Sequence, residues 1–315
     1  MTVLPEEDAI PRTLRDIPGW FYWADQHLFD VLLGAQANSP LGTLVELGVF
    51  KGKSAVLIGR YVRPGERFVV CDLFGAPADD PQNLRENNGS YRNLTRSTFE
   101  RNYLALHDEL PEIIQDLSSS VVDHVPDGTA RFVHVDASHL YEHVCGDIRA
   151  AQRMLRPDGI VVFDDYRSEH TPGVAAAVWQ AVGNGVLVPF AHTPNKLYAT
   201  FGDPSPYLRV VEAWAARSAG FAAHEEFVGS ARMFRVKHTP SGPKPADLAA
   251  IARELQATKE AVAKLSPLPR RVTQLERRVS SSAGSRNAAK TLLADLLPPA
   301  LVRAAARRRR RTRSA

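Results

Sequence analysis

The sequence predicts an α/β fold with a largely parallel sheet, and residues 130–166 supply the observations that predict it. Residues 131–135 and 160–163 are short, apolar and rich in β-branched side chains, which is typical of buried strands. Residues 139–155 carry apolar side chains at helical spacing, and a Pro-Asp-Gly turn at 157–159 ends that helix. A strand–helix–strand unit of this length is a right-handed crossover between parallel strands. Such sheets bind their ligands at the edge where the strands end.

Acidic residues follow both strands of this unit. Asp136 follows the first strand, Asp164 and Asp165 follow the second, and His139 lies three residues after Asp136. Three carboxylates at one edge repel one another, which raises their pKa values unless a positive group lies between them. Because oxygen ligands suit Mg2+ better than zinc, we predict a metal site at these three aspartates with His139 as an adjacent base. The alternative is that the acidic residues only cap the following helix or turn. His134 is expected to be a packed core histidine.

The composition limits the class of protein. The chain has 315 residues, 44% of them hydrophobic, which suffices for one α/β domain with appendages. The sequence contains no run of about 18 apolar residues, so no membrane-spanning helix is predicted. The acidic, proline-interrupted N-terminus is unlike a signal peptide. Cys71 and Cys145 are far apart in predicted regular structure, which argues against a disulfide framework or a zinc knuckle. We therefore expect a cytoplasmic protein.

The net charge of +4 comes from the C-terminal residues alone. Residues 238–315 contain 17 Lys and Arg against 5 Asp and Glu, whereas the preceding 237 residues contain 22 against 30. The globular part is therefore mildly acidic, and the basic isoelectric point carries no information about its substrate.

A glycine-containing turn follows the first predicted strand, residues 44–47. Glu46 lies in that strand, and Gly48, Gly52 and Ser54 follow it. Gly48 allows close approach of the backbone, Gly52 opens the next helix, and Ser54 can donate a hydrogen bond to a ligand. The turn lacks the G-x-G-x-x-G spacing of a nicotinamide-binding turn.

A second strand, residues 67–71, strengthens the case for a nucleotide-like cofactor. It ends at Asp72, twenty residues after Gly52, which is the offset at which an acid binds ribose hydroxyls. The turn and Asp72 together favour a nucleoside-containing cofactor; the alternative is a glycine-rich turn beside an unrelated acid. A third strand at 111–115 leads into a turn that ends at Ser118, where residues of such folds frame an adenine ring.

Other segments surround this core. Residues 1–18 are expected to form an extended arm, and residues 19–37 an amphipathic helix. Its Trp20 and Trp23 either line a substrate pocket or dock the helix against the sheet. Residues 75–110 are polar and are predicted to form a lid or a pair of short helices, suited to a polyhydroxylated acceptor or to a surface insertion. The remaining predictions are a helix at 119–125, helices at 171–182 and 207–218, a hairpin of strands at 186–191 and 196–201, and an antiparallel pair at 224–228 and 231–237.

These residues carry a resemblance to a known family. The segment ELGVFKGKS, the acid Asp72, the sequence DASH after the fourth strand and the strand RPDGIVVFDDY are together similar to the class I S-adenosylmethionine (SAM)-dependent methyltransferases. The chain resembles in particular the metal-dependent O-methyltransferases of sugars and natural products, a methyltransferase family 24-like branch. The resemblance covers residues 19–237. It implies a Rossmann-like sheet of seven strands with helices on both faces.

The resemblance also implies roles for individual residues. The positions that would hold SAM are Glu46, Gly48, Gly52, Ser54, Asp72 and Ser118, with Asp72 on the ribose. The positions that would hold Mg2+ are Asp136, Asp164 and Asp165, and His139 would be the general base beside Asp136. Metal-using relatives can carry Glu-Asp where this chain has Asp164 and Asp165. The shorter first side chain is expected to shift the ion or to leave that ligand position to water.

The function predicted from these residues is O-methylation of a hydroxyl of a sugar, a glycolipid or polysaccharide, or a glycosylated natural product. Methyl transfer from a sulfonium needs an electron-rich nucleophile. A bound dication lowers the pKa of a hydroxyl, and an imidazole can then take the proton. The alternatives are a metal-independent methyltransferase of small molecules, a nucleotide-cofactor oxidoreductase and a non-catalytic binding protein.

The tail is predicted to be separate from the catalytic domain. Residues 238–282 form a helical segment with apolar side chains at a/d spacing for fewer than three heptads, which suggests a homo-oligomer through a coiled coil. Residues 283–315 combine leucines with five consecutive arginines, Arg307–Arg311, which suits peripheral binding to an anionic membrane. Disorder with nonspecific polyanion binding is the alternative. No aromatic residues interleave with the arginines, so specific nucleic-acid recognition is not expected.

Overall fold

The structure is a computed structural model, and it describes residues 10–77 and 94–239. The chain divides into two compact units, Met1–Ser241 and Gly242–Ala315, and the described residues belong to the first. Residues 240–315 of the predicted tail, residues 78–93 of the predicted lid and residues 1–9 of the predicted arm lie outside the described residues.

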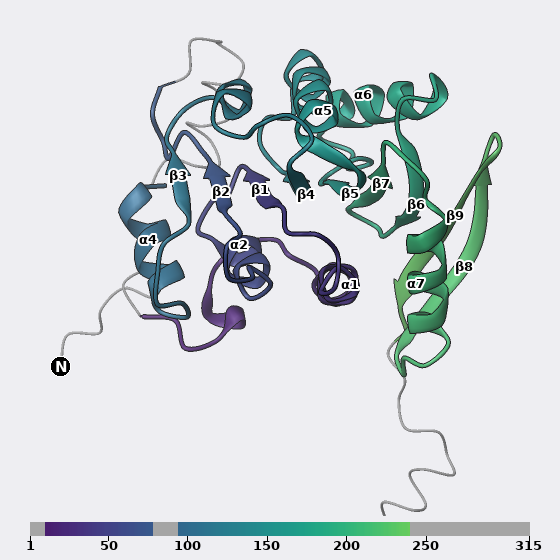
Figure 1. The fold of residues 1–315 in the computed structure, drawn as a ribbon, viewed down its shortest axis with the longest axis horizontal. Coiled ribbons are helices and arrows are strands. Elements are labelled where there is room, and N and C mark those ends of the chain that lie inside the picture. The colour runs from purple at the N-terminus through teal and green to yellow at the C-terminus, as the bar shows by residue number, and fades with distance from the viewer. Residues whose placement is uncertain (1–9, 78–93, 240–315) are drawn as a thin grey trace, which may run out of the picture. The chain divides into compact units, whose positions relative to one another are not determined.

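One sheet of nine strands organises the first unit, in the order β3-β2-β1-β4-β5-β7-β6-β9-β8 (Figure 1). The strands are β1 (Thr43–Leu47), β2 (Phe68–Cys71), β3 (Glu112–Ile114), β4 (Ala130–Val135), β5 (Leu155–Phe163), β6 (Val188–His192), β7 (Leu197–Thr200), β8 (Phe221–Val228) and β9 (Ala231–His238). Strands β1 to β5 pair in parallel, and β7 pairs antiparallel with β5. The predicted α/β fold is confirmed.

The sheet is longer than the seven strands that the resemblance implies. Strands β8 and β9 form the antiparallel pair expected from the sequence, and this hairpin joins the sheet because β9 runs parallel to β6. The hairpin therefore adds two strands at the β6 edge of the other seven (Figure 1). Helix α7 (Ser205–Ala215) packs against both strands of this hairpin.

Helices cover both faces of the sheet (Figure 1). They are α1 (Trp23–Ala35), α2 (Lys53–Gly59), α4 (Arg96–Leu104), α5 (Tyr141–Met154), α6 (Pro172–Gly183) and α7 (Ser205–Ala215), with short 3-10 turns at η2 (Leu14–Asp16) and η3 (Ser118–Asp123). Helices α1, α2, α4 and α7 contribute to one buried apolar cluster, and α5 and α6 to another. Because strand residues alternate between faces, β4 sends Phe132 into the first cluster and Val133 into the second.

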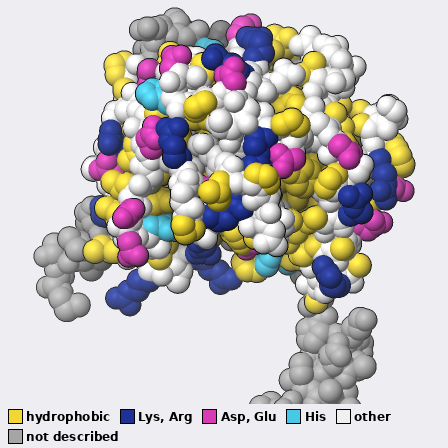
Figure 2. Space-filling view, viewed as in Figure 1, with side chains coloured by type: hydrophobic (Ala, Val, Ile, Leu, Met, Phe, Trp, Pro, Cys, Tyr) yellow, Lys and Arg dark blue, Asp and Glu magenta, His cyan; other side chains and the backbone are white. Residues whose placement is uncertain are grey.

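Two element boundaries differ from the sequence-based expectations by four or more residues. The first helix begins at Trp23 rather than residue 19, so Trp20 precedes the helix. Strand β5 begins at Leu155 rather than residue 160, because the Pro-Asp-Gly segment forms an irregularity within the β4–β5 pairing instead of a separate turn. Within the described ranges, no helix is both long and apolar enough to cross a bilayer. On the face drawn in Figure 2, basic and acidic side chains are interspersed.

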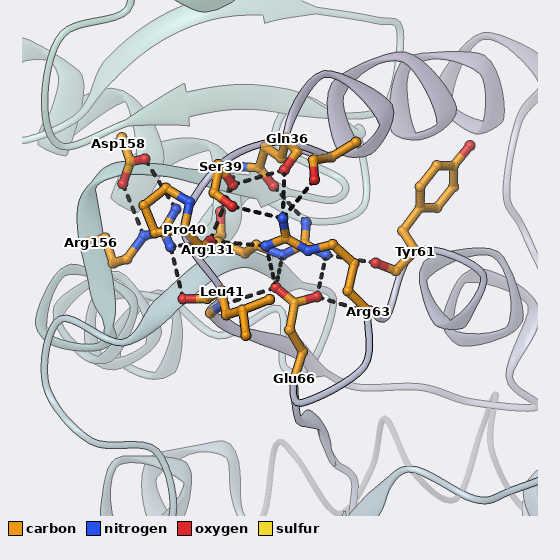
Figure 3. Close-up of polar contacts among 12 residues, drawn as sticks. Gln36, Ser39, Pro40, Leu41, Tyr61, Arg63, Glu66, Arg131, Arg156 and Asp158 are labelled. Carbon is orange, nitrogen blue, oxygen red and sulfur yellow. Dashed lines mark hydrogen bonds and ion pairs between the residues drawn. The ribbon is translucent and has the colours of Figure 1, made fainter.

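A buried ion-pair network lies at the edge of the sheet where β4 begins (Figure 3). The Arg131 guanidinium is 1% exposed and donates two hydrogen bonds to the Glu66 carboxylate, at 2.8 and 2.9 Å. Arg63 donates to the same carboxylate at 2.5 Å, and Gln36 accepts from Arg131 at 2.9 Å. Burial raises the pKa of Glu66, but the hydrogen bonds from Arg63 and Arg131 outweigh it and lower the pKa to about 2.

We expect Glu66→Gln to lower the free energy of unfolding by about 3 kcal/mol, because it leaves a buried guanidinium without its counter-charge. Urea unfolding measures this. Since the folded pKa of Glu66 is depressed, its contribution is present above the ordinary carboxyl pKa near 4.5 and is lost as the pH falls towards 2. The matched control is Asp127→Asn, which breaks the exposed pair with Arg153 and is expected to cost less than about 1 kcal/mol. Equal effects of the two substitutions would contradict the assignment.

Candidate active site

A pocket of about 1130 Å³ opens at the edge of the sheet where β1, β2, β4 and β5 end. This is the edge at which open α/β sheets bind ligands. Its wall includes most of the residues predicted as the site: Gly48, Ser54, Asp72, Ser118, Asp136, His139, Asp164 and Asp165. The structure thus brings these predicted residues together at one edge of the sheet, although several of their side chains have partners that the sequence did not reveal.

The turn after β1 needs glycine at two positions for different reasons. Gly48 has φ +78, and a Cβ built on it would lie 1.9 Å from the backbone oxygen of Asp136. No side chain fits between the ends of β1 and β4. Gly52 has φ +92 and precedes the first residue of α2, where a Cβ would lie 3.0 Å from the Phe99 ring. The predicted close approach of the backbone at Gly48 is therefore an approach to the neighbouring strand end.

Asp72 fastens this turn from the end of β2. Its Oδ2 accepts hydrogen bonds from the backbone N–H groups of Val49 at 2.7 Å and Phe50 at 3.0 Å, and its Oδ1 accepts from Phe74 at 2.7 Å. Burial raises the pKa of this carboxyl despite these bonds. Three donors use three of the roughly four lone-pair positions of a carboxylate. The remaining capacity, on the pocket wall, suits one hydroxyl of a ribose.

Glu46 lies beneath the pocket rather than on its wall. Its side chain is fully buried, and Oε1 lies 2.8 Å from Nδ1 of His134 on the adjacent strand. Burial raises the pKa of Glu46 to about 8, although a hydrogen bond from Ser54 lowers it. Its Oε2 has no partner among the described residues. A direct contact between Glu46 and a cofactor stays a prediction. In this structure the Glu46 carboxyl is buried and contacts His134.

His139 pairs with Asp165 on the pocket wall. Its Nε2 lies 3.5 Å from Asp165 Oδ2, and Ser168 donates to Asp165 Oδ1 at 2.5 Å. Asp165 has a left-handed backbone with φ +51, which turns its carboxylate away from the direction that Asp164 takes. An imidazole oriented by a carboxylate is the arrangement of a general base whose charged form is stabilised. His139, the predicted base, thus lines the pocket. Its partner, Asp165, was predicted from the sequence to bind a metal instead.

Asp164 has a cationic partner of a kind that the sequence analysis did not foresee. The ammonium of Lys196 lies 2.6 Å from Asp164 Oδ2 and 3.9 Å from Asp136 Oδ2. Burial lowers the pKa of Lys196, but Asp164, Asp136 and Asp25 raise it above its ordinary value, so the side chain is charged. Burial and the charge of Asp164 together raise the pKa of Asp136 well above its ordinary value.

The position of Lys196 follows from strand register. Leu197 in β7 pairs antiparallel with Phe163 in β5, which places Lys196 opposite Asp164. Sequence reasoning named Lys196 only as the start of a strand, because a hairpin turn does not reveal the strand that its second arm joins. Asp25 on α1 was missed as well. It is fully buried and accepts hydrogen bonds at 2.7 Å from both Thr193 and Tyr198.

The residues at this edge do not fit a divalent ion in the arrangement present. The three side chains with ligand atoms within 4.8 Å of one another, among the described residues, are His134, Asp136 and Asp164, without Asp165. The Lys196 ammonium already touches two of them, since its Nζ lies 2.9 Å from His134 Nε2. A dication there would face this charge. His134 is a fully buried histidine, as expected, and burial lowers its pKa well below the ordinary value.

Aromatic residues form the other side of the pocket. Trp20, Phe21 and Tyr22 line it immediately before α1, and Trp20 stacks on Phe50 with ring centroids 5.7 Å apart. Trp20 is 63% exposed, which is unusual for so large an apolar side chain. Of the two uses open to these aromatic residues, Trp20 lines the pocket. Leu28 and Phe29 instead dock α1 against the sheet.

Comparisons with known proteins support the resemblance that the sequence predicts. The family described as "Methyltransferase domain" matches residues 45–166, the segment from β1 to the end of β5 that supplies most of the pocket. The chain resembles the class I SAM-dependent methyltransferases. This resemblance, expected from the sequence, is confirmed over residues 45–166. No curated protein matches the chain.

Several solved structures are similar to the methyltransferase domain. The O-methyltransferase NovP is 20% identical, with a TM-score of 0.47 over 57% of this chain and 81% of that one. The apo structure of CalS11, a TDP-rhamnose 3'-O-methyltransferase of calicheamicin biosynthesis, is 21% identical, with a TM-score of 0.38 over 57% and 79%. MycE, in complex with Mg, S-adenosylhomocysteine and mycinamycin VI, is 16% identical, with a TM-score of 0.39 over 59% and 51%. Scores this low assign no substrate to this chain.

The pocket of the methyltransferase domain fits SAM. Asp72 retains acceptor capacity on the pocket wall, which suits a ribose hydroxyl, and Ser118 lines the same pocket. The volume of about 1130 Å³ exceeds that of ordinary ligand pockets, about 300 to 1,000 Å³, so there is room for an acceptor beside the cofactor. Two backbone hydrogen bonds to Asp72 hold the turn that follows Gly48.

Proposed function

We propose that this protein is a SAM-dependent O-methyltransferase that acts on a hydroxyl of a sugar, a glycolipid or polysaccharide, or a glycosylated natural product. The observation that carries the proposal is the His139–Asp165 pair in the same pocket as the Asp72 turn. Transfer of a methyl group to a hydroxyl requires a base and a bound donor in the same cavity. His139 is the proposed base, and Asp72 is the acid proposed to bind the nucleoside of the donor. The methyltransferase match over residues 45–166 supports the reaction class.

The residues of the chain have separable tasks in this reaction. SAM supplies an electrophilic methyl group when bound. Asp72 orients the donor from the β2 end. His139 takes the proton of the acceptor hydroxyl at Nδ1, the nitrogen that does not face Asp165, or through one water. Asp165 holds the imidazole and stabilises its charged form. Enclosing donor and acceptor in one pocket supplies the orientation that makes the displacement fast.

The acceptor class follows from the rest of the wall. Trp20, Phe21 and Tyr22 offer aromatic faces, whereas His170 and Asn195 offer hydrogen-bonding groups. A sugar presents an apolar ring face together with hydroxyls around its edge, and it therefore suits such a mixed surface. Of the predicted lid at residues 75–110, residues 78–93 lie outside the described residues, so its suitability for a polyhydroxylated acceptor stays a prediction.

The Mg2+ ion predicted at Asp136, Asp164 and Asp165 stays a prediction. It requires Asp165 to leave Ser168 and His139, and Asp164 to share its carboxylate with an ammonium. A metal-independent methyltransferase, the alternative stated at the outset, is favoured by Lys196. The oxidoreductase alternative finds no support, because the methyltransferase family matches the glycine turn itself. Cytoplasmic localisation, a homo-oligomer through the tail and peripheral contact with anionic membranes also stay predictions.

Binding of S-adenosylhomocysteine, measured by titration calorimetry, tests the cofactor assignment. We expect Asp72→Asn to weaken it by about 10- to 100-fold, because hydrogen bonds to a charged group contribute about 1.5 to 3 kcal/mol. The matched control is Asp108→Asn, an exposed acid outside the pocket, which should leave the affinity unchanged.

Turnover is then measured by mass spectrometry of sugar and glycoside acceptors incubated with SAM. Absence of S-adenosylhomocysteine binding by the intact protein would refute the proposed function. Methylation of nitrogen rather than oxygen in the acceptor would contradict the reaction class.

A further inference from the structure

Lys196 is the most deeply buried cation at the pocket edge in the described part of the chain. Its side chain is 1% exposed. Its ammonium contacts Asp164 Oδ2 at 2.6 Å and His134 Nε2 at 2.9 Å, and it lies 5.6 Å from the centre of the Phe21 ring. An ammonium has three donors and no acceptor, so protein groups use most of its capacity. Lys196 is absent from the pocket wall and therefore acts from behind it.

The side chains around Lys196 form one buried series of polar contacts across the sheet. Glu46 in β1 and His134 in β4 are register partners, so their side chains share a face. His134 bridges Glu46 through Nδ1 and Lys196 through Nε2, and Lys196 then reaches Asp164 at the end of β5. The Nε2 atom accepts from the ammonium, so Nδ1 carries the hydrogen that points at Glu46. This series of contacts holds the Lys196 ammonium between His134 and Asp164.

Asp136 and Asp164 need a positive charge to lie close together as anions. Two cations could supply it: an external dication or the ammonium of Lys196. The ammonium is bound covalently to β7 and is held in place by strand register, whereas a dication would have to enter beside it. Two cations a few Å apart in a partly desolvated site repel strongly.

We propose that the Lys196 ammonium replaces a divalent ion at this site, and that methyl transfer by this protein needs no divalent metal. Lys196 is a positioning residue: it holds Asp136 and Asp164 at the reacting edge. Proton removal from the acceptor then falls to the pair of His139 and Asp165. This inference rests on the proposed function, since it concerns the same pocket.

The test uses Mn2+ as a probe and the full-length protein with S-adenosylhomocysteine bound. Electron paramagnetic resonance counts bound Mn2+. We expect the unaltered protein to bind no stoichiometric Mn2+, and EDTA to change kcat/KM by less than about twofold. Lys196→Met removes the charge at similar length, and we expect it to increase Mn2+ affinity at least about tenfold. Lys196→Arg keeps the charge and should not gain the ion. Adding Asp164→Asn to Lys196→Met should abolish the gain.

One stoichiometric Mn2+ in the unaltered complex, with turnover abolished by EDTA and restored by Mg2+, would overturn the inference. If Lys196→Met fails to fold, the titration of the unaltered protein decides by itself. The two proposals fail differently. Loss of the proposed function appears as absence of S-adenosylhomocysteine binding, whereas a metal-dependent enzyme binds S-adenosylhomocysteine and also requires the ion.

Discussion

Replacing His139 with glutamine is expected to lower kcat by about 10²- to 10⁴-fold, the usual contribution of a positioned general base. Glutamine keeps hydrogen-bonding capacity near Asp165 but cannot take a proton from an alcohol. Because His139 is assigned to proton transfer rather than to cofactor binding, S-adenosylhomocysteine affinity should change by less than about threefold. Steady-state kinetics with an acceptor that the enzyme methylates measure the first effect, and calorimetry with S-adenosylhomocysteine measures the second.

The matched control is His224→Gln, which changes an exposed histidine on β8 outside the pocket and should leave kcat unaltered. A full-rate His139→Gln enzyme would remove His139 from the mechanism. Loss of S-adenosylhomocysteine affinity in proportion to the loss of kcat would instead show that His139 contributes to cofactor binding.

Replacing Gly48 with alanine is expected to lower the free energy of unfolding by more than about 4 kcal/mol, a size reserved for severe packing faults. The added Cβ would meet the backbone oxygen of Asp136 at 1.9 Å, and neither strand end can move without breaking the β1–β4 ladder. The left-handed backbone at φ +78 adds strain for any residue with a side chain. Any protein that still folds should lose S-adenosylhomocysteine binding, because the same turn is held by Asp72.

Gly146→Ala is the matched control for Gly48→Ala. Gly146 lies inside α5, and a Cβ there would meet no atom within 4 Å. Alanine should therefore stabilise the protein, by about 0.5 to 1 kcal/mol, through the higher helix propensity. Urea unfolding of both variants gives the comparison. Similar stability of Gly48→Ala and the unaltered protein would show that the turn is more adaptable than the structure indicates.

Much of the fold could be predicted from local patterns. The apolar runs at β1, β4 and β5 are buried on both faces, and such runs are legible without knowledge of their neighbours. Helix α5 was predicted from its apolar spacing to within two residues at either end. The attachment of the β8–β9 hairpin to β6 could not be predicted, because parallel pairing between distant segments leaves no mark on either segment.

The candidate site was predictable where residues immediately follow a strand. Asp72, Asp136 and Asp164 each come directly after a buried strand, so their location at one edge follows from the parallel topology. Their partners do not follow in this way. Asp165 binds Ser168 and faces His139 because of its left-handed backbone, and the sequence contains no sign of that conformation.

The sequence by itself determined the α/β class, the edge that carries the pocket, and a set of acids and one imidazole suited to methyl transfer. These follow from short-range periodicity and from the residues at strand ends. Only the tertiary structure decided which cation accompanies the acids. Lys196 reaches Asp164 through the antiparallel register of β5 and β7, a long-range pairing chosen by the packing of the whole sheet.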